Sequence, residues 1–124
     1  MRVTESEENY LESILMISEK KDKVKAVDIA RKLDFSKPSV SYAVKNLQEK
    51  GLIEIKENND IVLTKAGYDI AEEIYDRHNV VAKVLMFMGV NEETAYRDSC
   101  EIEHRISQES FDRIKQYAKD NNIY

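Results

Sequence analysis

The stretch AVDIARKLDFSKPSVSYAVKNLQEKG, residues 26–51, decides the fold class of this chain. Its first part, 26–33, and its second, 37–50, both space their apolar side chains as amphipathic helices do. Between them, Asp34-Phe35 forms a turn, and Ser36 suits the N-cap of the second helix. Pro38 is tolerated in a first helical turn, and Gly51 suits the position just after a helix. Two short helices joined by a tight turn predict a helix-turn-helix.

Two short strands follow directly. Residues 52–56 (LIEIK) and 61–63 (IVL) are strand-like, and the turn-rich sequence ENND at 57–60 separates them. A hairpin placed immediately after the second helix of a helix-turn-helix is the wing of a winged helix.

The flanking sequence predicts helices. Thr4-x-x-Glu7 matches a capping box and opens an amphipathic helix over about residues 5–20. Further on, three polar residues precede apolar periodic runs and suit helix N-caps: Thr64, Asn91 and Ser107. They predict a long helix ended by Gly89, a helix over about 92–105, and a last helix after 107. We therefore predict a mainly α protein, with a winged helix-turn-helix and small β-hairpin wing over 1–64 and an all-α domain over 65–124.

Charge is unevenly distributed along the 124 residues, whose net charge is −5. Residues 20–50 contain nine Lys or Arg and four Asp or Glu, a net charge of +5, so the remainder carries −10. A basic segment at a helix-turn-helix indicates nucleic acid as a partner, although a solvated helical face has the same composition. The lone cysteine fits a reducing cytosol, and no apolar stretch is long enough for a membrane span. We expect a cytoplasmic protein with no membrane partner and too small for a large catalytic cavity.

Short polar groups gather at the start of the second helix of the motif. Hydroxyls allow close approach to bases and phosphates, and lysines neutralise phosphates. The candidates for DNA contact are Ser36, Lys37, Ser39, Ser41, Tyr42 and Lys45. A purely structural explanation is that Ser36 and Ser39 only cap the helix.

A candidate metal-binding pattern lies in the predicted helix over 92–105. Cys100, Glu103 and His104 stand at positions i, i+3 and i+4, so a thiolate, a carboxylate and an imidazole share one helical face. That set suits Fe²⁺, Mn²⁺, Co²⁺ or Zn²⁺ rather than Ca²⁺ or Mg²⁺. One helix supplies only part of a coordination shell. His78 and Glu12 are further candidates, with Asn9 one turn before Glu12, although each residue alone has an ordinary structural explanation.

Taken together, these blocks resemble the metal-dependent repressors of the diphtheria toxin repressor and manganese transport regulator family. The resemblance covers nearly the whole chain, and its length is similar to the two-domain members, which lack the SH3-like domain. The matching blocks are Glu8-Asn9-Tyr10-Leu11-Glu12, Asp28-Ile29-Ala30, Ser36-x-Pro38-Ser39-Val40-Ser41, Leu63-Thr64-x-x-Gly67, Arg77-His78 and Cys100-Glu101-Ile102-Glu103-His104-x-x-Ser107.

The resemblance implies a homodimer on palindromic operator DNA, with residues 65–124 as the dimerisation and metal-binding domain. It assigns ligand positions to His78, Cys100, Glu103 and His104, and Glu12 matches the helix 1 carboxylate of the manganese branch. Asn9 stands where that branch has Asp, and Cys100 where it has Glu and the iron branch has Cys. The DNA contact positions that match are Ser36, Pro38, Ser39, Ser41 and Tyr42.

The predicted function is a metal-dependent transcriptional regulator, a repressor of metal-uptake genes, and not an enzyme. Fe²⁺ or Mn²⁺ is the expected corepressor that favours the DNA-competent homodimer, with Zn²⁺ or Co²⁺ able to bind in vitro. The main competing hypothesis is a winged-helix regulator that responds to a non-metal ligand. Weaker hypotheses are a zinc enzyme with an open coordination position and a metal-buffering protein.

Overall fold

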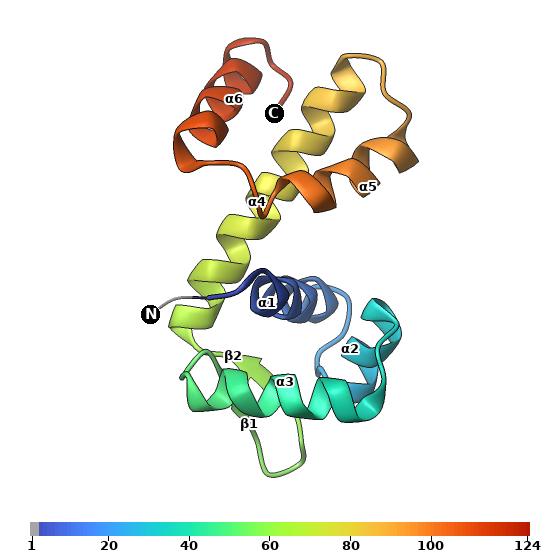
Figure 1. Ribbon diagram of the computed structural model, residues 1–124, viewed down its shortest axis with the longest axis vertical. Coiled ribbons are helices and arrows are strands. Elements are labelled where there is room, and N and C mark those ends of the chain that lie inside the picture. The colour runs from blue at the N-terminus through green and yellow to red at the C-terminus, as the bar shows by residue number, and fades with distance from the viewer. Residues whose placement is uncertain (1–2) are drawn as a thin grey trace. The chain divides into compact units, whose positions relative to one another are not determined.

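The computed structural model describes residues 3–124 and is built from helices with one small sheet (Figure 1). In chain order the elements are α1 (Glu5–Ser18), α2 (Ala26–Leu33), α3 (Lys37–Glu49), β1 (Ile53–Ile55), β2 (Ile61–Leu63), α4 (Lys65–Phe87), α5 (Glu92–Ile102) and α6 (Gln108–Asp120). The prediction of a mainly α chain with a winged helix-turn-helix and an all-α second part is confirmed.

The chain forms two compact units, Met1–Glu72 and Glu73–Tyr124, and α4 begins in the first and ends in the second. The functional division at residues 64 and 65 remains a prediction, and residues 1 and 2 of its first domain lie outside the described part. None of the helices within residues 3–124 is long and apolar enough to cross a membrane.

The first unit packs α1, α2 and α3 around a common core. Its fully buried side chains include Leu11, Ile14, Ile29, Val40 and Leu47. The local signals operate as expected: the Thr4 hydroxyl accepts from the Glu7 amide and the Glu7 carboxylate accepts from the Thr4 amide. Asp34 ends α2 with φ of 57°, a left-handed turn that sends the chain into α3.

The wing is an antiparallel hairpin in which Ile53 pairs with Leu63 and Ile55 with Ile61. The return to α4 demands a glycine. A Cβ at Gly67 would lie 2.0 Å from the Leu52 carbonyl oxygen, so no other residue fits without a backbone shift. The Thr64 hydroxyl accepts from the Gly67 amide at 3.2 Å and donates to the Gly51 carbonyl at 2.7 Å. The Thr64 hydroxyl and the glycine three residues later therefore connect the end of the wing to the start of α4.

The second unit consists of the rest of α4 with α5 and α6. Buried Val80, Phe111 and Ala118 form its core, and four half-buried apolar side chains pack on them: Val84, Ile106, Ile114 and Ile123. The predicted caps are present. The Asn91 side chain accepts from the amides of Glu93 and Thr94, and the Ser107 side chain accepts from the Ser110 amide.

Three boundaries differ from the prediction. α1 ends at Ser18, the first strand is the three residues Ile53–Ile55, and α5 ends at Ile102 rather than near Arg105. After Ile102 the chain tightens, since the amides of Arg105 and Ile106 both donate to the Ile102 carbonyl at 3.0 Å. Glu103 and His104 thus lie in a C-terminal turn rather than inside the helix.

Candidate functional site

The imidazole of His78 on α4 faces the end of α5. His78 is only 7% exposed, and its Nδ1 lies 2.9 Å from Oε2 of Glu103 and 3.7 Å from Sγ of Cys100. The buried Ser99 hydroxyl is 3.0 Å from the same nitrogen and donates to the Tyr96 carbonyl. The nitrogen, the sulfur and the carboxylate oxygen lie within 4.8 Å of one another. The structure therefore brings His78, Cys100 and Glu103 together.

Glu103 lies between two imidazoles. Its side chain is fully buried at the C-cap of α5, and its Oε1 is 3.3 Å from Nε2 of His104. The His104 side chain is also almost fully covered. A buried carboxylate needs a charged or hydrogen-bonding partner, and His78 Nδ1 lies at hydrogen-bonding distance from one oxygen of Glu103.

The neighbours of His78 change its protonation. Burial alone disfavours the imidazolium, but hydrogen bonds to Cys100 and Glu103 and the negative charge of both groups outweigh burial. Together they raise the pKa of His78 from 6.5 to about 10. Near neutral pH this nitrogen holds a proton in the metal-free chain.

The donor set fits a transition metal. Two donors of one ion are at most about 4.5 Å apart, roughly twice a usual metal–ligand bond. His78 Nδ1 lies 2.9 Å from Glu103 Oε2 and 3.7 Å from Cys100 Sγ. His104 Nε2 lies 3.3 Å from Glu103 Oε1. All three distances are below that limit. Nitrogen, sulfur and carboxylate oxygen together suit a borderline transition ion.

Ser99 is a member of this cluster that the sequence did not predict. It directly precedes Cys100, and no spacing rule distinguishes it from the other serines of the chain. Only the packing of α4 against α5 shows that its hydroxyl reaches the His78 nitrogen.

The two candidates on α1 belong to the first unit. Glu12 is buried and Asn9 is half-buried, and they lie one helical turn apart. Their role as metal ligands remains a prediction.

The predicted DNA-contact residues form the exposed face of α3 and its N-cap. The opposite face buries Val40, Val44 and Leu47 in the first unit. All seven predicted contact residues are exposed: Ser36, Lys37, Pro38, Ser39, Ser41, Tyr42 and Lys45. Ser36 does cap the helix, since its hydroxyl accepts from the Ser39 amide. Tyr42 is 71% exposed.

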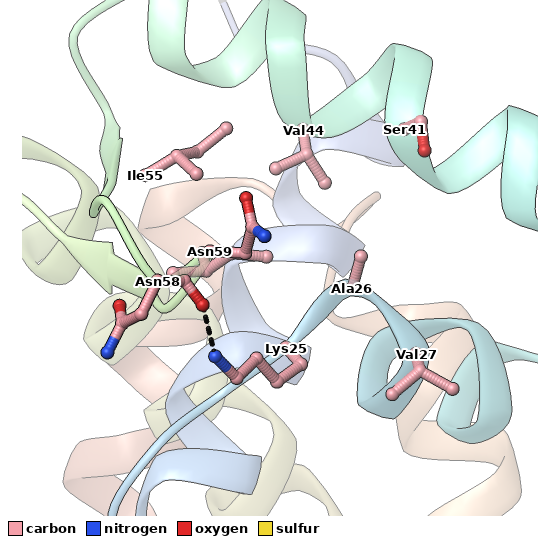
Figure 2. A pocket seen from close by; sticks show the side chains of 9 residues that line it. Lys25, Ala26, Val27, Ser41, Val44, Ile55, Asn58 and Asn59 are labelled. Carbon is pink, nitrogen blue, oxygen red and sulfur yellow. Dashed lines mark hydrogen bonds between the residues drawn. The ribbon is translucent and has the colours of Figure 1, made fainter.

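Grooves border this helix. One is lined by the start of α2, by Ser41 and Val44 of α3, and by Asn58 and Asn59 of the wing (Figure 2). Lys25 connects the start of α2 to the wing, because its ammonium contacts the Asn58 carbonyl and lies 2.5 Å from Asp60. A second groove is lined by Thr4, Tyr10, Ser39, Tyr42 and Lys50, among others. The wing and α2 residues were not predicted, because only folding places them beside α3.

Comparison with known proteins covers almost the entire chain. The family model "Iron dependent repressor, N-terminal DNA binding domain" matches residues 2–61, and "Iron dependent repressor, metal binding and dimerisation domain" matches residues 64–122. The HTH-type transcriptional regulator MntR of Bacillus velezensis is 35% identical over 121 residues, which cover 95% of this chain and 85% of that protein. The transcriptional regulator MntR of Escherichia coli O157:H7 is 32% identical over 112 residues, 90% of this chain and 72% of that protein.

A solved structure has the same fold. IdeR of T. acidophilum superposes with a TM-score of 0.82 at 25% identity, over 96% of this chain and 55% of that one. The chain thus spans about half the length of that solved relative.

Proposed function

Since this chain belongs to the iron-dependent repressor family, we propose that it is a metal-dependent transcriptional repressor of metal-uptake genes, with Fe²⁺ or Mn²⁺ as corepressor. The family prediction is confirmed, as are double-stranded DNA and a second copy as partners and a divalent metal as cofactor. The hypothesis of a regulator for a non-metal ligand has no support in these matches.

The observation that carries the proposal is the meeting of three different donor atoms, two on the buried residues His78 and Glu103 and one on the exposed Cys100. Nδ1 of His78 lies within 3.7 Å of both the Cys100 sulfur and the Glu103 carboxylate, inside the segment that matches a metal-binding domain. A structural role for His78 needs only one hydrogen-bond partner. Three convergent donors of different softness are typical of a transition-metal site.

We propose His78, Cys100, Glu103 and His104 as ligands, joined by Glu12 and, more weakly, by the amide oxygen of Asn9. The support for the last two is the resemblance of the sequence. The thiolate of Cys100 favours Fe²⁺ over Mn²⁺ in the cell and also allows Zn²⁺ or Co²⁺ in vitro.

When bound, the ion supplies positive charge and a preferred arrangement of its donors. The chain's own residues supply the ligands and the DNA contacts. Glu103 holds a buried negative charge between two imidazoles, and His78 gives up the proton on Nδ1. On the DNA side, Lys37 and Lys45 neutralise phosphates while exposed hydroxyls approach the groove. Linkage then requires metal and operator to raise each other's affinity by the same factor.

The exposed end of α4 is our candidate for part of the dimer contact. Phe87 and Met88 are 62% and 71% exposed within the segment that matches a dimerisation domain. Large adjacent apolar side chains left in solvent mark an association surface.

The relatives are transcriptional regulators, and we propose no enzymatic activity for this chain. We also propose that it acts in the cytoplasm, where operator DNA is accessible and a lone cysteine stays reduced.

The experiment is an anaerobic titration of the metal-free protein with Fe²⁺, Mn²⁺ and Zn²⁺. Binding to DNA from its own upstream region is followed by fluorescence anisotropy. We expect tight binding only with metal, and its loss in the double variant Cys100→Ala, His104→Ala. Equally tight operator binding in excess chelator would refute the metal mechanism and leave an organic effector as the better explanation.

A further inference from the structure

Arg77 reaches the end of α5 from α4. Its Nη1 donates to the backbone carbonyls of Glu103, at 3.2 Å, and of Ile106, at 2.9 Å. Its Nη2 donates to the Gln108 side chain at 2.8 Å, and the guanidinium lies over the Phe111 ring at 5.3 Å from its centre. The side chain is only 12% exposed. One arginine therefore bonds both ends of the turn between α5 and α6.

The bonded carbonyls belong to the segment that carries two proposed ligands. Glu103 is itself one, and His104 lies between the two carbonyls that Nη1 binds. Carbonyls at a helix C-terminus lack partners within the helix, and a cation there is favoured by the helix dipole. The guanidinium suits this place because it donates to several acceptors in a rigid plane.

Arg77 is also the residue directly before His78. The same turn of α4 thus presents one proposed ligand to the site and holds the backbone of two others. If the bonds from Arg77 were lost, the turn would keep only its own backbone bonds, and the 2.9 Å approach of Glu103 to His78 would be less firmly fixed.

We propose that Arg77 is a positioning residue of the metal centre: it sets the placement of Glu103 and His104 relative to His78 without touching the ion. This inference rests on the proposed metal-binding function. Loss of such support around metal ligands lowers metal affinity about 10- to 100-fold.

A control contact exists between α4 and α6, the helix that Arg77 also meets at Gln108 and Phe111. Lys115 of α6 pairs with Asp76 of α4 at 2.6 Å, so it also joins α4 to α6 through an ionic contact. No bond from Lys115 to the turn after α5 is present among the described contacts. Lys115→Gln therefore removes a partly exposed ionic contact between α4 and α6 and leaves the ligand segment held.

The test is calorimetric titration of the metal-free protein with Mn²⁺ and Co²⁺ under anaerobic conditions. For Co²⁺, the thiolate-to-metal absorption reports bonding to Cys100. We expect Arg77→Gln to weaken both ions about 10- to 100-fold, with Arg77→Lys recovering part of the loss. Lys115→Gln should stay within about twofold of the unmodified protein.

Circular dichroism of each metal-free variant establishes that it is folded, and where Arg77→Gln unfolds, Arg77→Lys carries the comparison. Folded Arg77 variants that bind metal as tightly as the unmodified protein overturn the inference and leave the proposed function intact. An equal loss in Lys115→Gln overturns it too, because the effect is then general destabilisation. An unmodified protein that binds neither ion refutes both the inference and the proposed function.

Discussion

Raising the pH should destabilise the metal-free protein through His78. The folded chain holds this proton more tightly than the unfolded chain, because the pKa of His78 is about 10 against an ordinary value of 6.5. Stabilisation from a raised pKa is complete below 6.5 and disappears as the pH rises through about 10. The window for the loss is therefore neutral to alkaline.

The magnitude follows from the shift. Each pH unit between the two pKa values removes about 1.4 kcal/mol, so stability falls by up to about 3 kcal/mol from pH 6.5 to 9. His78 is itself buried and lies 2.9 Å from Glu103, but Cys100, the other group that raises its pKa, is exposed, so solvent screening makes this magnitude an upper bound. Metal affinity should move the other way, rising with pH, since the ion must displace the same proton.

The assay combines urea unfolding of the metal-free protein at pH 6.5 and 9 with an NMR titration of its two histidines. His78 should remain charged through pH 8 and titrate near 10. In His78→Gln the pH dependence between 6.5 and 9 should largely vanish. A His78 midpoint at or below 7, or an unchanged slope in the variant, would show that its neighbours do not hold the proton.

Three further outcomes are expected. Glu103→Gln keeps the side-chain shape but removes the charge between the two imidazoles, and calorimetry should show Mn²⁺ affinity lowered by at least about tenfold; unchanged affinity would remove Glu103 from the ligand set. Lys37→Ala and Lys45→Ala should each weaken binding to DNA of any sequence. Each should also reduce the slope of log affinity against log salt concentration by about 1. A slope equal to that of the unmodified protein would argue against phosphate contact. Phe87→Glu should weaken the dimer at least about tenfold in sedimentation equilibrium, whereas an unaltered dimer would place the contact elsewhere.

Local sequence signals were sufficient to predict the helices and the wing. Thr4, Ser36, Asn91 and Ser107 act as N-caps where predicted, because a cap depends on amides two or three residues away. The spacing of Val40, Val44 and Leu47 likewise sets which face of α3 is buried, and so which residues remain exposed for DNA. The ligand pattern in Cys100-Glu101-Ile102-Glu103-His104 was visible from the sequence, and the family resemblance added meaning to it.

Only the tertiary structure shows which side chains from different helices meet. The turn after α5 also receives hydrogen bonds from Arg77 to the carbonyls of Glu103 and Ile106, which lie 26 and 29 residues further along the chain. The proximity of His78 to Ser99, Cys100 and Glu103 requires α4 to pack on α5, and that packing also produces the raised pKa of His78. Spacing reveals which side chains lie close together along the chain. Which helix they face, and which protons they hold there, depends on burial and charge between elements far apart in sequence.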